Sequence, residues 1–409
     1  MVIYRSYWAC AVVGSACALA AFLQSGGVRC GVVVAAPVLS PAKAPDPPDP
    51  TPRRGDLVYA AAYSRDGKLL ALAQPKPHVG DGEHRVLVFD TVTWKQTHTL
   101  TGPTDHCFGV AFSADGRVLF AACSDGLVYS WETKSGTPGP KLDARAGRCD
   151  AVALSPDGTV LVTGHLVLEN KEPKRAEVRL WDAATGKSLR TITSGPALLW
   201  SSLTFTPDGK ALAGCYNNPL TGPDDFSGVV EWDVTTGKER KRYDAVRVTA
   251  GAHPISHAVE YTPDGKWLIV GGGEAVPDPK FGGTIGFGYL WLFDRATGRL
   301  EKTLVERRHH YIRRLALSPE GDRLFVPTYS EPQLVRENGV IQERSTGELQ
   351  CWDTRTWELK WAKETDRTYW AVIASPDGRR VGTATSSGFS LRDAKSGDPK
   401  GGLIDARRE

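Results

Sequence analysis

Seven side chains of mixed chemistry recur at one fixed place in the sequence, five residues before a short turn of the Ser-Pro-Asp-Gly type. They are Tyr59, Phe108, Asp150, Ser201, His257, Arg313 and Trp370, and Arg314 lies next to Arg313. Together they offer a carboxylate, a hydroxyl, an imidazole, two guanidinium groups and three aromatic rings. Aromatic and arginine side chains are enriched among the residues that dominate protein interfaces. We therefore predict that these eight residues, named the binding ring, contact a partner molecule.

Packing between neighbouring repeats is the alternative role for these positions, above all for Phe108 and Trp370. The positions three residues before each turn look different, because all of them are small or aliphatic. They are Ala61, Val110, Val152, Leu203, Val259, Leu315 and Val372. A ring that served packing alone would show the same uniformity, and the binding ring does not. Both roles stay open at this point.

No residue spacing in the sequence is typical of a catalytic or metal centre. A Gly-x-Ser-x-Gly elbow, a phosphate-binding loop and a CxxC pair are all absent. The glycine-rich stretch Gly282–Gly288 lacks a strand-to-helix context, and we expect it to be a flexible loop. Asp224, Asp225 and Asp278 can bind a cation in principle, but they lack the ordered oxygen spacing of a calcium site. The sequence thus predicts no enzyme activity, no cofactor and no metal site.

Two short motifs alternate along the chain and define a repeat. The first is the segment Val178–Lys187, in which alternating apolar residues lead to Trp-Asp and then to a Thr-Gly-Lys turn. The second is the turn Ser155–Gly158. Each motif occurs seven times, and the glycines of the second are Gly67, Gly116, Gly158, Gly209, Gly265, Gly321 and Gly378. Strict alternation of two such motifs is the signature of a repeat architecture.

Each repeat predicts four strands, which we name a to d in chain order. In the third repeat they span Cys149–Leu154, Thr159–Thr163, Val178–Trp181 and Leu189–Thr193. A four-stranded sheet cannot bury both faces alone, so the copies must stack on one another. We predict an all-β, seven-bladed propeller of four-stranded antiparallel blades over residues 56–409. Its blades are approximately 56–101, 102–144, 145–194, 195–244, 245–305, 306–364 and 365–409.

The repeats resemble those of the WD40 family, most clearly in the second copy. There Leu100–Asp105 (LTGPTD) leads into Val110–Gly116 (VAFSADG), and Trp131-Glu132 ends the unit. The resemblance implies a propeller, with partner contacts near the start of each strand a. Pro103 stands where the family usually has the histidine of a Gly-His pair. The resemblance therefore implies that the hydrogen-bond network anchored by that histidine is missing or replaced.

Strand alternation places the b–c and d–a connections on one face of the disc, and the binding ring lies near that face. Five b–c connections are long: Gln74–His84, His165–Ala176, Cys215–Ser227, Glu274–Phe287 and Tyr329–Thr346. We predict that they are loops around a binding mouth, because loops on a rigid scaffold commonly carry function. Neutral drift of loop length is the alternative. For closure of the ring, we favour Gly402–Ala406 as the last strand over Gly31–Ala35.

The first 55 residues differ from the repeats. Arg5 precedes the apolar run Tyr7–Leu23, and Ala18–Ala20 has the small-x-small pattern of a signal-peptidase site. We predict a signal peptide or membrane anchor in residues 1–36 and a proline-rich linker in residues 37–55. Cleavage, a retained anchor and lipidation at Cys17 stay open. The expected location is outside the cytoplasm, or cytoplasmic if the start of the chain is misassigned.

Cysteines and charge constrain the remaining possibilities. Cys107 and Cys149 occupy matching places in adjacent repeats, so we expect the cysteines of the repeats to be free thiols in the core. The formal charge of +3, from 50 basic and 47 acidic residues, argues against a dominant nucleic-acid-binding surface.

We predict a monomeric, non-catalytic scaffold that binds a protein partner at the mouth. The alternatives are a lactonase-like propeller hydrolase, with Asp150 and His257 as the nearest metal ligands, and a small-ligand or glycan sensor.

Overall fold

The structure is a computed structural model, and it describes fourteen segments of the chain. These are residues 57–75, 83–143, 147–169, 172–193, 199–217, 227–244, 253–278, 283–308, 310–330, 333–337, 340–344, 347–365, 369–385 and 388–405. The predicted leader, the linker and the alternative closing segment Gly31–Ala35 lie outside the described residues. Within them, no helix has the length and apolar character needed to cross a bilayer.

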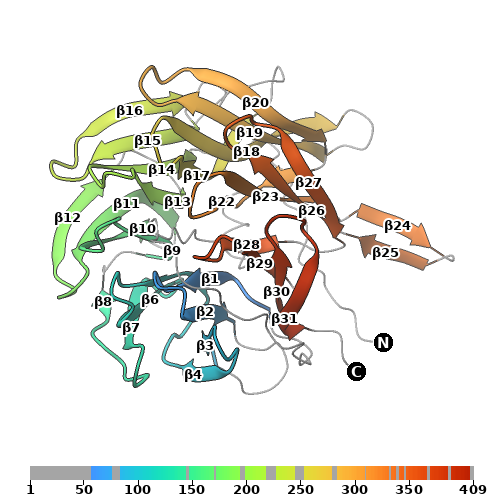
Figure 1. The fold of residues 1–409 in the computed structure, drawn as a ribbon. Coiled ribbons are helices and arrows are strands. Elements are labelled where there is room, and N and C mark those ends of the chain that lie inside the picture. The colour runs from blue at the N-terminus through green and yellow to red at the C-terminus, as the bar shows by residue number, and fades with distance from the viewer. Residues whose placement is uncertain are drawn as a thin grey trace.

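Seven antiparallel sheets follow one another around a centre in chain order, which confirms the predicted propeller (Figure 1). Blade 1 consists of β1 (Ala60–Tyr63), β2 (Leu69–Gln74), β3 (Arg85–Asp90) and β4 (Gln96–Leu100). Blade 2 consists of β5 (Cys107–Phe112), β6 (Val118–Cys123), β7 (Leu127–Glu132) and β8 (Leu142–Asp143). Blade 3 consists of β9 (Cys149–Leu154), β10 (Val160–Glu169), β11 (Glu172–Asp182) and β12 (Ser188–Thr193). Blades 4 and 5 consist of β13 (Leu199–Phe205), β14 (Ala211–Asn217), β15 (Gly228–Asp233), β16 (Glu239–Asp244); and β17 (His253–Tyr261), β18 (Trp267–Asp278), β19 (Gly283–Asp294), β20 (Leu300–Arg308).

The last two blades complete the circle. In blade 6 the first strand is split into β21 (His310–Ile312) and β22 (Ala316–Leu317), and both pair with β23 (Arg323–Ser330), which is followed by β26 (Gly347–Asp353) and β27 (Leu359–Thr365). Blade 7 consists of β28 (Tyr369–Ala374), β29 (Arg380–Thr385), β30 (Gly388–Asp393) and β31 (Pro399–Asp405). Because β31 pairs with β30, the C-terminal segment supplies the fourth strand of this blade, as predicted.

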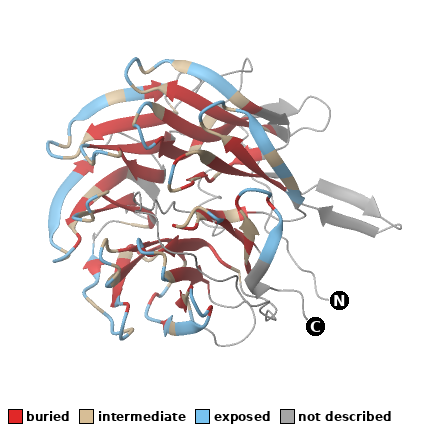
Figure 2. Ribbon diagram, viewed as in Figure 1, coloured by how far each residue is buried: buried red, intermediate tan, exposed pale blue. Residues whose placement is uncertain are grey.

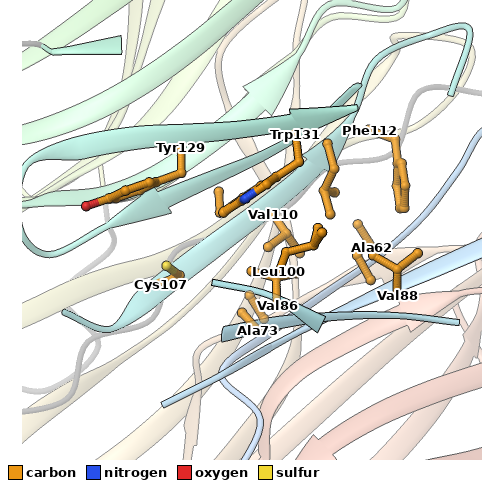
Figure 3. Close-up of a cluster of buried hydrophobic side chains, with 14 of the residues drawn as sticks. Ala62, Ala73, Val86, Val88, Leu100, Cys107, Val110, Phe112, Tyr129 and Trp131 are labelled. Carbon is orange, nitrogen blue, oxygen red and sulfur yellow. The ribbon is translucent and has the colours of Figure 1, made fainter. Parts of the chain in front are cut away.

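The apolar core lies between blades. Seven clusters of buried side chains each combine residues of two neighbouring blades, and one of them joins blade 7 to blade 1. Figure 3 shows the cluster between blades 1 and 2, where Trp131 and Val110 face Val86 and Leu100. The outermost strands are mostly exposed to solvent, as in β12 and β16 (Figure 2). Alternating apolar residues therefore bury each sheet against its neighbours.

The c–d turns follow from the Trp-Asp motif. In blade 3 the Asp182 carboxylate accepts hydrogen bonds from the backbone N–H of Ala184 and Thr185 and from the Thr185 hydroxyl. Gly186 closes the turn with a φ of 71°, in the left-handed region that favours glycine. Trp94 and Trp357 occupy the corresponding place in blades 1 and 6, with φ of 57° and 58°. Blades 1 and 6 thus put an indole where the other turns have glycine.

The a–b turns interlock around the opposite end of the disc. In blade 3 the Ser155 hydroxyl donates to Asp157 and accepts from the Val160 N–H. The turn glycines lie against the turn of the preceding blade. A Cβ on Gly321 would lie 2.1 Å from Pro263, whereas one on Gly116 would find its nearest neighbour, Ser64, at 3.8 Å. Glycine is needed at Gly321 both for its φ and for this close approach.

The prediction that the long b–c connections are loops is wrong for three blades. In blades 3 and 5 the strands β10–β11 and β18–β19 continue far beyond the sheet as two-stranded ribbons. In blade 6 the insertion forms a separate hairpin of β24 (Gln333–Glu337) and β25 (Val340–Arg344). In blades 1 and 4, residues 76–82 and 218–226 lie outside the described residues. The long connections of blades 3, 5 and 6 thus form β structure.

The glycine-rich stretch was also predicted wrongly, because Gly283–Gly288 belongs to strand β19. One of these glycines, Gly286, serves close packing. A Cβ on Gly286 would lie 2.2 Å from the ring of Tyr311 in the next blade.

The expectation of free thiols is wrong for two cysteines. Cys107 and Cys123 form a disulfide, while Cys149, Cys215 and Cys351 are buried and free. The two bonded residues face each other on β5 and β6 of the same blade. Comparing Cys107 only with Cys149, in the next blade, missed this partner across the strand pair.

Other contacts replace the missing Gly-His histidine. In blade 2 the Asp125 carboxylate accepts hydrogen bonds from the Thr104 and Tyr129 hydroxyls, at 2.7 and 2.8 Å. In blade 3 the indole N–H of Trp181 donates to the Thr163 hydroxyl, which lies 2.7 Å from Nε2 of the buried His165. Burial lowers the pKa of His165 to about 3, so the ring is neutral. Strand b thus provides a histidine that the sequence pattern had placed in a loop.

Candidate functional site

All members of the binding ring except Tyr59, which immediately precedes β1, lie at irregularities in the innermost strands. Phe108 is skipped in the pairing of β5 with β6, since Cys107 pairs with Cys123 and Gly109 with Ala122. The same skip occurs at Asp150, at Ser201 and Ser202, at His257 and at Trp370. In blade 6 the first strand is interrupted at Arg313–Leu315. A β-bulge changes the side-chain direction at its position, so these positions break the regular alternation of each strand.

Three aromatic rings of the binding ring touch in sequence around the channel. The ring centroids of Trp370 and Tyr59 are 5.6 Å apart, and those of Tyr59 and Phe108 are 5.2 Å apart. The Arg148 guanidinium stacks over the Phe108 ring at 5.1 Å. We name Trp370, Tyr59 and Phe108 the aromatic arc; it runs through blades 7, 1 and 2. Tyr59 and Phe108 are only 3% and 2% exposed, whereas Trp370 is half-buried. Phe108 therefore has a packing role, and Trp370 is the accessible member.

Arg314 lies at the other end of the arc with an incomplete set of partners. Its Nε donates to the Trp370 carbonyl at 2.9 Å, and its Nη1 donates to the Arg313 carbonyl at 2.8 Å. Its Nη2 has no acceptor among the described atoms, although the residue is only 4% exposed. Burial lowers the pKa of Arg314 to about 9, and no carboxylate of the described residues pairs with it. A buried guanidinium without a counter-charge is energetically costly.

A second buried donor belongs to Trp370, the residue whose backbone carbonyl accepts from Arg314. The indole nitrogen Nε1 of Trp370 is buried and has no acceptor among the described atoms. Arg314 and Trp370 are already joined through the Trp370 carbonyl. The boundary between blades 6 and 7 therefore holds two buried N–H groups that have no acceptor among the described atoms.

The other members of the binding ring are spread around the channel. His257 and Arg313 are half-buried. Asp150 and Ser201 lie on the described backbone of β9 and β13, and their side chains are outside the described part. The structure thus brings together Tyr59, Phe108, Trp370, Arg313 and Arg314.

Two residues near the aromatic arc were missed by the sequence reasoning. His106 contacts both Tyr59 and Phe108, at centroid distances of 5.3 and 5.9 Å, and Arg148 stacks on Phe108. Each stands two residues before the ring position of its own repeat. The positions seven residues before each turn, compared across repeats, would have revealed them.

The opposite end of the channel holds a cavity of about 130 Å³. Its wall includes the turn prolines Pro156, Pro207, Pro263, Pro319 and Pro376. The carboxyl of Glu260, which is 8% exposed, also lines it. Burial raises the pKa of Glu260 to about 8, and its side chain accepts a long hydrogen bond, at 3.5 Å, from the Thr204 hydroxyl. A buried carboxyl of this kind is neutral at pH 7.

Comparison with known proteins identifies the repeat. The family described as "WD domain, G-beta repeat" matches residues 94–132, which cover β4 of blade 1 and β5–β7 of blade 2. Protein groucho of Drosophila melanogaster is 26% identical over 202 residues, covering 43% of this chain and 26% of the relative. The uncharacterized WD repeat-containing protein sll1491 of Synechocystis is 28% identical over 156 residues, covering 38% of this chain and 40% of the relative. The match therefore spans less than half the length of either relative.

A solved structure with the same fold is a chain of Kuenenia stuttgartiensis hydrazine synthase. Its TM-score is 0.62 at 16% identity, over 83% of this chain and 97% of that one. At this identity the likeness concerns the fold alone.

Proposed function

Because the chain is a seven-bladed propeller of WD40 repeats, we propose that it is a non-catalytic scaffold that binds a protein partner at the mouth lined by the binding ring. The observation that carries the proposal is the pair of buried, unsatisfied donors, Arg314 Nη2 and Trp370 Nε1, beside the aromatic arc. WD40 propellers commonly bind proteins, and matching relatives are WD-repeat proteins. A partner that reaches this place satisfies both donors and covers the accessible face of Trp370.

The chemistry of this place defines what the partner must present. A carboxylate, from an acidic side chain or a chain terminus, supplies the counter-charge that Arg314 lacks among the described residues. An apolar or aromatic group beside it packs on Trp370. A monomeric propeller with one such mouth then binds one acidic segment of a partner protein.

We also propose that the protein works outside the cytoplasm, either released or tethered by its N-terminal segment. The apolar run Tyr7–Leu23 supports export. The Cys107–Cys123 disulfide supports it independently, because such bonds persist in oxidising compartments.

The hydrolase alternative needs Asp150 and His257 to hold a metal, and the Asp150 side chain lies outside the described part.

Crosslinking in extracts of the source organism tests the proposal, with captured proteins identified by mass spectrometry. Trp370→Ala and Arg313→Ala are the test variants. Trp361→Ala, on the outer strand β27, and Arg117→Ala, beside an a–b turn, are matched controls that change the same residue types away from the mouth. A protein captured by the wild type and both controls, and lost from both test variants, supports the proposal. Capture that is unchanged in the test variants overturns it.

A further inference from the structure

Three potential metal ligands converge at the boundary between blades 1 and 2. They are His84, which immediately precedes β3, and Asp105 and His106, which precede β5. One ligand atom from each residue lies within 4.8 Å of the other two. The imidazoles of His84 and His106 meet edge to face at a centroid distance of 4.8 Å. His106 Nδ1 lies 2.7 Å from Asp105 Oδ1. All three residues are half-buried, so an ion can reach them from solvent.

The backbone that carries Asp105 and His106 is held firmly. The His106 carbonyl accepts a hydrogen bond from the Ser124 N–H at 2.8 Å. The next residue, Cys107, is bonded to Cys123 by the disulfide. The His106 N–H donates to the Asp105 carboxylate at 2.7 Å. The first two restraints fix the segment to the end of β6 and the third holds the Asp105 carboxylate against the backbone, so the two side chains meet a ligand without ordering a loop first.

His84 approaches from a different blade with its own support. Its neighbour Arg85 begins β3, pairs with Gln74 of β2 and donates to the Gln74 side chain at 2.9 Å. The two sides of the group are therefore anchored in two separate sheets. An ion bound between them joins blade 1 to blade 2, next to Tyr59 of the aromatic arc.

We propose that His84, Asp105 and His106 bind one divalent transition-metal ion of the Zn²⁺ type. Two imidazoles and one carboxylate are ligands that Zn²⁺ and its first-row neighbours accept readily. Ca²⁺ and Mg²⁺ prefer oxygen ligands and are not expected to compete. Three protein ligands leave a fourth position open to water or to a group of a bound partner. This site uses no residue of the binding ring, although His106 contacts Tyr59 and Phe108 of the aromatic arc.

Calorimetric titration of the chelator-treated full chain with Zn²⁺ tests the site, and the visible absorption of the Co²⁺-loaded protein reports the ligands. The test variants are His84→Ala and Asp105→Asn, the second of which keeps the size of the side chain. His98→Ala is the matched control, because His98 lies on the outer strand β4 of blade 1, away from the group. Melting curves of each variant without metal establish that it is folded.

We expect one equivalent of Zn²⁺ for the wild type and for His98→Ala. In both test variants the affinity for Zn²⁺ should fall by more than roughly tenfold, which is the loss caused by removal of an outer-shell partner. The Co²⁺ spectra of both variants should also differ from that of the wild type. Wild-type affinity in both test variants would show an adventitious ion only and would overturn the site. Absence of stoichiometric Zn²⁺ binding by the wild type would overturn it as well. Neither result bears on partner capture, which is measured separately.

Discussion

The indole N–H of Trp181 donates a hydrogen bond of 2.8 Å to the hydroxyl of Thr163 across strands β11 and β10. The same hydroxyl lies 2.7 Å from His165 Nε2, so one buried side chain satisfies two others. In blade 3, residues of strand b thus provide a buried polar contact for the tryptophan of the Trp-Asp motif. This contact is the basis of the first prediction.

Replacing Thr163 by valine keeps the shape of the side chain and removes its hydroxyl. The Trp181 N–H and His165 Nε2 both lose their partner in a buried place, at a cost of about 1–3 kcal/mol. We expect a lower urea midpoint of unfolding. Thr193→Val, at the exposed end of β12, is the control and should leave the midpoint unchanged. Equal midpoints for the two variants would show that the buried contact contributes no stability.

Reduction of the disulfide should destabilise the protein. The bond closes a loop with a sequence separation of 16 residues, for which chain entropy suggests about 3 kcal/mol. We expect dithiothreitol to lower the melting temperature of the wild type. Cys149→Ser should retain this response, because Cys149 is free. A Cys107→Ser/Cys123→Ser variant should lose it. The prediction fails if the double variant responds to the reductant as the wild type does.

Alanine substitutions at two turn glycines measure the cost of backbone strain separately from the cost of crowding. Gly116 and Gly321 have φ of 71° and 68°, so alanine at either costs about 1–2 kcal/mol from conformation alone. Only at Gly321 does the new Cβ collide with Pro263. We expect Gly321→Ala to lower the free energy of unfolding by about 1–3 kcal/mol more than Gly116→Ala. Equal losses, measured by denaturant unfolding, would contradict the interlocking of neighbouring turns.

The buried carboxyl of Glu260 should make stability depend on pH. Its pKa is raised from 4.5 to about 8 in the folded state, so the folded protein retains a proton that the unfolded chain has lost between these values. The contribution of Glu260 to the free energy of unfolding therefore falls as pH rises from about 4.5 to about 8, by an amount on the order of a few kcal/mol.

Glu260→Gln removes the titrating group and provides the measurement. The difference in unfolding free energy between this variant and the wild type should grow in favour of the variant between pH 5 and pH 8. A difference that stays constant over this interval would mean that the carboxyl is not held neutral in the fold.

Arg314→Met should separate stability from binding. An apolar side chain of similar length removes a buried charge that has no carboxylate partner among the described residues, and the desolvation of such a charge is costly. We expect an unfolding midpoint that is unchanged or higher, together with loss of partner capture. Retained capture would exclude the guanidinium from the interface.

The sequence predicts the parts of the fold that depend on residues close to one another along the chain. In blade 3 the strands Cys149–Leu154 and Leu189–Thr193 agree with β9 and β12 to within one residue. Their ends are set by Asp and Gly turns, and the hydrogen bonds of those turns lie within a few residues. The order of the sheets follows from the number of turns and the need to bury both faces of each sheet.

Features that depend on register across strands escaped prediction. The partner of Cys107 is Cys123 because β5 pairs with β6 around a bulge at Phe108, and the sequence pattern does not reveal that bulge. His165 falls in strand β10 because the pairing with β11 continues past the expected end of the sheet. The contact between His84 and His106 joins two blades, so periodicity within one repeat does not reveal it.

The closing strand β31 has a consequence for chain topology. The described strands pair only within their own blades, and the first and last blades meet through side chains, as every other neighbouring pair does. The position of the break in the covalent chain is therefore not fixed by any strand pairing. A circularly permuted propeller, with β31 joined to β1 by a linker and new ends opened between two other blades, would keep all seven sheets intact.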